Sequence, residues 1–212
     1  MNWPATIANS LWVGSGLPSW LNFRHALNQP AEVQWDLLHH LLTQNADSAY
    51  GRAHCFGEVK TYEEFAQRVP LVDYEDLEPW IDRIRRGEPQ VLTREAVTHL
   101  IPTSGSTGAR KLIPFTVGLQ QQFNHAISPW MVDLVQRHPT ILFGSAYWFI
   151  TPAQSSAVAE PSAVPIGFAD DASYLGGVKS RLGRSARVTP GELRAGADLN
   201  EFRFRTLLCL LR

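Results

Sequence analysis

The chain has 212 residues, which is enough for one or two domains of ordinary size with a sizeable hydrophobic core. Its 44% apolar content and formal net charge of −1 are typical of a globular protein without a global field that attracts nucleic acid or an anionic membrane. The two cysteines lack CxxC spacing and no stretch approaches the roughly 18 apolar residues of a membrane span, so we expect a cytoplasmic protein without membrane contact.

Two helices are predicted before residue 46. Residues 11–27, which include Trp12 and Trp20, carry little charge and predict a short helix. Pro30 suits the first position of a second helix. Apolar side chains then recur at helical spacing as far as Asn45, which predicts an amphipathic helix that ends there.

Two N-terminal capping signals predict the next helices. Thr61 followed by Glu64 is a capping box, and we expect its helix to continue to residue 68. Asp73 followed by Asp76 opens another helix, which Gly87 ends. Basic residues in the last turn suit the dipole of that helix, so we expect no nucleic-acid binding from them. They are Arg83, Arg85 and Arg86.

A segment rich in Gly, Ser and Thr follows, between two predicted strands. Residues 97–101 alternate in polarity and residues 112–115 are apolar, which favours a strand on each side of the loop. Thr116 suits the cap of a helix over residues 117–137, which Pro129 is expected to kink or divide. The side chains of this helix expected to point inward are Phe123, Ile127 and Val132.

The loop itself, within residues 102–116, has the composition of a polyphosphate cradle. Glycine permits the positive φ angles that turn several backbone N–H groups toward one point. Hydroxyl side chains add donors, and Lys111 adds a positive charge. The spacing fits neither a P-loop nor a GxGxxG motif, and a flexible hairpin turn is the alternative that composition leaves open. The candidate binding residues are Thr103, Ser104, Gly105, Ser106, Thr107 and Gly108.

These residues carry a resemblance to known enzymes. The run Thr103-Ser-Gly-Ser-Thr-Gly-Ala-Arg-Lys111 resembles the phosphate-loop signature of the adenylate-forming superfamily, T-S-G-[ST]-T-G-x-x-K. Its continuation KLIPFT and the segments 51–57, 68–80 and 87–93 are similar to one branch, the auxin-responsive-promoter (Gretchen Hagen) family of acyl-acid–amido synthetases. The resemblance covers about residues 30–150.

The resemblance implies a fold and a reaction. The expected fold is α/β, the N-terminal part of the large domain of an adenylate-forming enzyme, with a mixed sheet and flanking helices. The implied reaction is ATP-dependent adenylation of a carboxylic acid followed by transfer to an amine such as an amino acid, with ATP and Mg²⁺ as cofactors. Lys111 would be the catalytic residue that offsets charge on the leaving pyrophosphate, and the loop would hold the β- and γ-phosphates. A non-catalytic remnant or binding module with the same fold is the alternative.

The C-terminal third is less regular. Residues 140–144 and 146–151 read as strands, the first of them buried. Residues 152–197 are rich in Pro, Ser, Ala and Gly; in the resembling family an excursion lies here beside the acyl-substrate pocket, and a loosely packed loop is the alternative. Asp198 begins a last helix.

We expect residues 1–212 to form a partial N-terminal domain, with the C-terminal domain absent. The family's Tyr-x-Ser-Ser-Glu-like segment, which the resemblance assigns to positioning the nucleotide and its magnesium, does not occur before Arg212. The chain alone is therefore expected to be truncated and inactive. A cluster of leucines at its end is expected to lie exposed and to cause self-association. These are Leu207, Leu208, Leu210 and Leu211.

Overall fold

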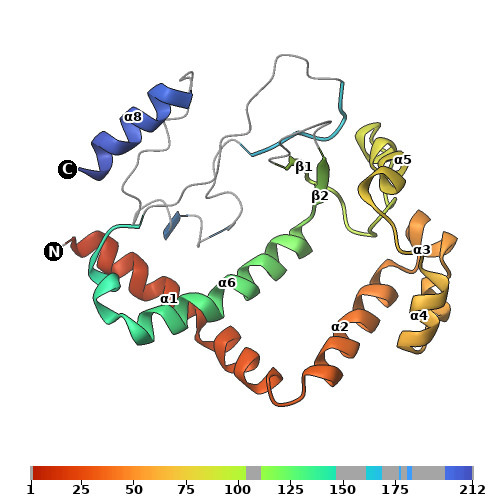
Figure 1. Cartoon of the computed structure of the whole chain (residues 1–212), viewed down its shortest axis with the longest axis horizontal. Helices are drawn as coiled ribbons and strands as arrows, with labels where there is room; N and C mark the ends of the chain where they lie inside the picture. The colour runs from red at the N-terminus through yellow and green to blue at the C-terminus, as the bar shows by residue number, and fades with distance from the viewer. Residues whose placement is uncertain are drawn as a thin grey trace. The chain divides into compact units, whose positions relative to one another are not determined.

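The computed structural model describes residues 2–103, 111–146, 161–168, 177, 181–182 and 199–211 (Figure 1). The chain divides into two compact units. The hairpin unit comprises residues 24–119 and 153–167, and the α1–α6 unit comprises residues 1–23, 120–152 and 168–212.

Three helices of the hairpin unit begin and end close to where the sequence predicts them, and two short ones over residues 49–53 and 56–58 were not predicted. The Thr61 hydroxyl accepts a hydrogen bond from Glu64 N–H at 3.2 Å, and the Glu64 carboxylate accepts one from Lys60 N–H at 2.7 Å, one residue before the predicted partner. The Asp73 and Asp76 carboxylates accept reciprocal bonds from each other's backbone N–H, both at 3.1 Å. The helices are α2 Pro30–Asn45, α3 Ala49–Ala53, η1 Phe56–Glu58, α4 Tyr62–Arg68 and α5 Tyr74–Arg85.

Two short strands make the sheet of this unit. Strand β1, His99–Pro102, pairs antiparallel with β2, Leu112–Phe115. On its other side Leu100 forms a parallel bridge with Ile166, in which Leu100 N–H donates to Pro165 O at 2.9 Å. The described part of the predicted sheet is therefore a two-stranded antiparallel hairpin with one isolated parallel bridge, in a mostly helical structure.

The core of the hairpin unit lies between α5 and the sheet. Ile81 and Ile84 of α5 are buried together with Val91 and Leu100, and Tyr74 and Leu112 pack against them. Burial of each such aliphatic side chain contributes about 1.5–3 kcal/mol. This cluster fixes the first turn of α5 beside the start of β2, where the predicted loop ends.

The α1–α6 unit is helical. Helix α1, Trp3–Ala26, begins eight residues earlier than the predicted start at residue 11, because the Asn2 carboxamide caps it by accepting a bond from Ala5 N–H at 3.3 Å. Helix α6, Val117–Arg137, crosses α1 (Figure 1). A β-carbon at Gly16 would lie only 3.3 Å from Ser128 Cβ, so the two helix backbones approach closely there. The other elements whose bounds the structure describes in this unit are η2 Pro139–Phe143 and α8 Leu199–Leu210.

Two predictions concern the course and the packing of helix α6. Of the two outcomes expected at Pro129, a kink or a division, the division does not occur, because the helix is continuous from residue 117 to residue 137. The Ser128 hydroxyl, next to the proline, donates to Asn124 O at 2.7 Å. Val132 is buried as predicted, whereas Phe123 is 38% exposed.

The predicted buried strand over residues 140–144 is wrong. This segment is the 3₁₀ helix η2, with Pro139 at its first position and Ile141 N–H donating to His138 O at 3.2 Å. Proline fixes a φ angle that suits a helix start, and this favours the turn over an extended strand. Ile141 and Phe143 are exposed rather than buried.

Some predictions fall on segments outside the described residues, namely the loop 104–110, the strand over 147–151 and most of 152–197. None of the described helices combines the length and the apolar character that crossing a bilayer requires. The four C-terminal leucines, part of the described chain, are exposed as the sequence predicts.

Candidate functional site

The strands hold both ends of the predicted phosphate loop. Pro102 pairs with Leu112, and beyond this pair Thr103 N–H donates to Lys111 O at 2.9 Å. Residues 104–110 lie outside the described residues, so the anchors Thr103 and Lys111 are the parts of the candidate site that the structure locates. The two residues predicted to bound the loop are thus brought face to face.

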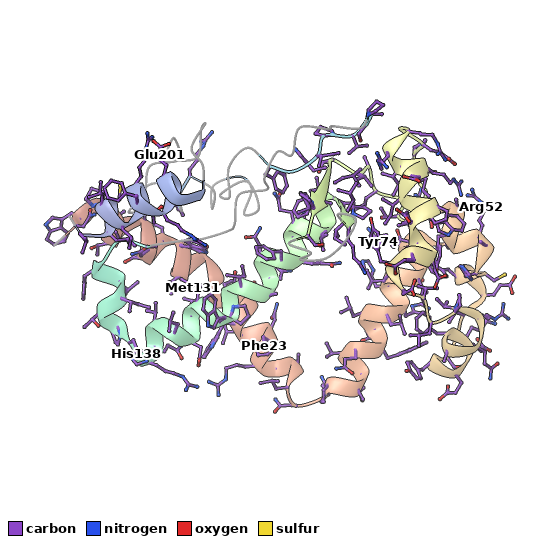
Figure 2. The ribbon with its side chains drawn as sticks, turned by 45° about the horizontal axis from the view of Figure 1, so that its top comes forward. Phe23, Arg52, Tyr74, Met131, His138 and Glu201 are labelled. Atoms are coloured by element: carbon purple, nitrogen blue, oxygen red, sulfur yellow. The ribbon has the colours of Figure 1, made fainter. Side chains whose placement is uncertain are left out.

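Lys111 lies against the first turn of α5. Its ammonium nitrogen is 3.7 Å from Glu75 Oε1 and 5.1 Å from the centroid of the Tyr74 ring. The next residue, Leu112, donates its backbone N–H to the Tyr74 hydroxyl at 2.7 Å. Tyr74, labelled in Figure 2, therefore contacts both the backbone of β2 and the lysine that ends the loop.

The electrostatics around Lys111 are mixed. The side chains of Lys111 and Glu75 are 47% and 68% exposed, so this ion pair is solvated and weak. The carboxylates of Asp73 and Asp76 already accept the N–H groups at the start of α5, so this helix terminus offers few donors to an added anion. Lys111 is therefore the described group that can neutralise a phosphate here.

Thr103 can contribute less than its position in the motif predicts. Its backbone N–H already donates a hydrogen bond to Lys111 O, so the side-chain hydroxyl is the group of Thr103 that can donate to a phosphate. The remaining predicted binding residues, from Ser104 to Gly108, lie outside the described residues.

The helix that follows the hairpin is fixed at its start by two side chains. The Thr116 hydroxyl accepts a bond from Leu119 N–H at 3.1 Å, which confirms the predicted cap. The Glu95 carboxylate accepts a hydrogen bond from Gly118 N–H at 2.8 Å, and it also accepts one from the Gln44 side chain at 3.1 Å. Sequence reasoning missed Glu95, since it lies 23 residues before its helical partner.

A second feature is a cavity of about 340 Å³ inside the α1–α6 unit. Its wall includes Trp12 of α1 and Met131 of α6, the latter labelled in Figure 2. None of the described residues that line it is charged. The Asn9 amide donates to Gly144 O at 2.9 Å, and Ser145 accepts a bond from Asn2. The part of the cavity wall that the structure describes therefore offers apolar surface and no cation for a carboxylate.

Metal ligands are not gathered in the described part of the chain. No group of three or more His, Cys, Asp or Glu side chains there is arranged to hold an ion. Cys55 and Cys209 are both free thiols.

The fold is that of the N-terminal part of an acyl acid amido synthetase. A solved structure titled "GH3.15 acyl acid amido synthetase" matches with a TM-score of 0.70, at 24% identity, over 91% of this chain and 33% of that one. A second, "AtGH3.15 acyl acid amido synthetase in complex with 2,4-DB", matches with a TM-score of 0.57, at 26% identity, over 68% of this chain and 25% of that one.

The family follows from the sequence. Residues 21–212 match the GH3 family N-terminal domain, so the chain belongs to the GH3 family. It is 29% identical over 189 residues to "Indole-3-acetic acid-amido synthetase GH3.15" of Arabidopsis thaliana, covering 84% of this chain and 30% of that protein. It is 39% identical over 87 residues to GH3.17 of the same plant, covering 40% of this chain and 14% of that protein. The matched part of the chain covers less than a third of the length of either relative.

Proposed function

We propose that this chain carries the phosphate-binding part of an ATP-dependent acyl-acid–amido synthetase. The observation that carries the proposal is the hairpin: Thr103 and Lys111, the two ends of the signature loop, are hydrogen-bonded to each other at 2.9 Å. A loop with fixed ends loses less entropy when its donors converge on a ligand, which favours binding. Membership of the GH3 family supports the same conclusion.

Each loop residue has a role in this proposal. The backbone N–H groups and hydroxyls of the loop bind the β- and γ-phosphates, and the Lys111 ammonium offsets the charge that develops on the pyrophosphate. Bound ATP supplies an α-phosphorus that a carboxylate can attack. Mg²⁺ arrives with the nucleotide phosphates, as it commonly does. The phosphate-binding residues are Ser104, Gly105, Ser106, Thr107 and Gly108, with the Thr103 hydroxyl.

The proposed substrates are a small carboxylic acid and an amine such as an amino acid. Support comes from the relatives named amido synthetases, one of which has a solved structure titled as a complex with 2,4-DB. We further propose that residues 1–212 are one part of a longer catalytic unit, since the match covers 84% of this chain but only 30% of a relative that shares this domain. We then expect phosphate binding by this chain without ATP–pyrophosphate exchange.

Calorimetric titration of the 212-residue chain with pyrophosphate and with MgATP tests the phosphate site. Lys111→Ala should weaken binding by about 1.5–3 kcal/mol, the scale of a hydrogen bond to a charged group. Lys60→Ala is the matched control, because Lys60 is an exposed lysine that precedes the α4 cap in the same unit. Equal affinities for the unmodified chain and Lys111→Ala would refute the proposed site.

The alternative, a non-catalytic binding module, predicts a different result from a longer protein that contains this domain. A ligase would show pyrophosphate exchange that depends on a carboxylic acid and is lost in Lys111→Ala. A binding module would bind its ligand without exchange under any carboxylic acid tested.

A further inference from the structure

The contacts of Lys111 suggest roles for two residues that the motif does not include. We propose that Glu75 is a counter-ion that holds the Lys111 ammonium when no phosphate is bound, and that Tyr74 is a positioning residue for that ammonium and for the start of β2. The inference rests on the proposed function, because it assumes that Lys111 binds phosphate. Both residues belong to the first turn of α5, and all the contacts lie within the hairpin unit.

The geometry of the ion pair suits an exchangeable partner. The 3.7 Å between Lys111 Nζ and Glu75 Oε1 is longer than a good hydrogen bond, and both side chains are largely in solvent. An exposed pair of this kind is weak and easily separated. A phosphate oxygen at normal hydrogen-bond distance is a stronger partner for an ammonium. Glu75 therefore restrains the lysine without preventing its transfer to the ligand.

Tyr74 acts through two different parts of its side chain. The hydroxyl accepts the Leu112 N–H at 2.7 Å, which fixes the first residue of β2. The face of the ring lies 5.1 Å from the Lys111 ammonium, within the range of a cation–π contact. Asp73 caps the helix immediately before Tyr74, so the backbone from which the ring projects is itself restrained.

Pyrophosphate affinity distinguishes a specific counter-ion from a general charge effect. Glu75→Gln removes the competing charge and should bind pyrophosphate about two- to fivefold more tightly, the range that an exposed ion pair permits. The matched control is Glu78→Gln, which removes the same charge from an exposed position on the same helix and should change affinity less. Equal affinities for the two variants would overturn the role of Glu75.

Two measurements test Tyr74. Tyr74→Phe keeps the ring but removes the acceptor for Leu112 N–H, so we expect the Leu112 amide proton to shift upfield and pyrophosphate affinity to fall. In the ligand-free chain the Lys111 ε-methylene protons should be shifted upfield by the Tyr74 ring current. Saturation with pyrophosphate should remove that shift, and Tyr74→Leu should abolish it.

These outcomes separate the inference from the function on which it rests. An unmodified chain that does not bind pyrophosphate refutes the phosphate site, and the ring-current shift in that same sample still tests the resting contact. If pyrophosphate binds but leaves the Lys111 shift unchanged, or if Tyr74→Phe binds as tightly as the unmodified chain, the phosphate site stands and the role of Tyr74 is wrong.

Discussion

Replacing Gly118 with alanine tests whether the Glu95 carboxylate holds the start of α6. Glu95 Oε2 accepts a hydrogen bond from Gly118 N–H at 2.8 Å, and Oε1 accepts one from the Gln44 side chain at 3.1 Å. A β-carbon on residue 118 would lie 2.4 Å from Glu95 Oε1, which is too close for any real contact. Because the carboxylate is the end of a flexible side chain, we expect it to move away and to lose its bond to the helix.

Two effects of opposite sign set the size of the change. Loss of a hydrogen bond to a charged acceptor costs about 1.5–3 kcal/mol, whereas alanine in place of glycine stabilises a helix by about 1 kcal/mol. The expected net result for Gly118→Ala is a loss of about 0.5–2 kcal/mol at the start of α6. In a Glu95→Ala background no carboxylate obstructs residue 118, so the same substitution should instead stabilise the helix by about 1 kcal/mol.

Native-state hydrogen exchange of the α6 amides measures this local free energy of opening directly. The four chains of the double-mutant cycle are the unmodified protein, each single variant and the double variant. The diagnostic result is a change of sign for Gly118→Ala between the two backgrounds. If the substitution has the same effect in both, the Glu95 carboxylate does not hold the helix start and the reasoning is refuted.

Two further predictions concern the hairpin unit. A β-carbon at Gly51 would lie 2.1 Å from the backbone oxygen of Asn45, so Gly51→Ala should lower the free energy of unfolding by more than about 2 kcal/mol in urea denaturation. The control is Gly57→Ala, whose β-carbon would meet an ordinary contact at 3.6 Å. An equal loss of stability in the two variants would contradict the predicted clash at Gly51. The Arg83 guanidinium donates to Glu88 and holds the pKa of that carboxyl below its ordinary value of 4.5, so this stabilisation is present above that pH and is lost as the pH falls through the lowered pKa. Thermal melts of Glu88→Gln should therefore show lower stability than the unmodified chain at pH 7, with a difference that shrinks as the pH falls below 4.5. A difference that stays constant with pH would show that the ion pair is not the cause.

Local signals in the sequence determined much of the hairpin unit. The caps at Thr61, Asp73 and Thr116 bond to backbone N–H groups three residues later, and Pro30 begins its helix. Each depends on residues within one helical turn, so a short stretch of sequence contains all the partners. The two strands around the loop were predicted for the same reason, because their polarity pattern is local.

The ambiguous apolar run after α6 shows where local pattern fails. By periodicity alone, five residues such as 139–143 suit a strand or a helical turn equally well. Pro139 favours the helical turn at its start, and the described strands pair with each other and with Ile166 rather than with this segment.

Some residues of the candidate site could be predicted from the sequence, and others could be found only in the tertiary structure. The sequence alone supplied the loop, its terminal Lys111 and the family resemblance that the GH3 match confirms. Only the tertiary structure placed Tyr74 and Glu75 beside Lys111, and Tyr74 lies 38 residues before Leu112, to which it is hydrogen-bonded. Likewise, only the tertiary structure placed Glu95 beside Gly118, which lies 23 residues later in the chain. Such contacts leave no periodic signal in the chain, because they arise when burial of the α5 and β1 side chains in one core fixes distant segments beside each other.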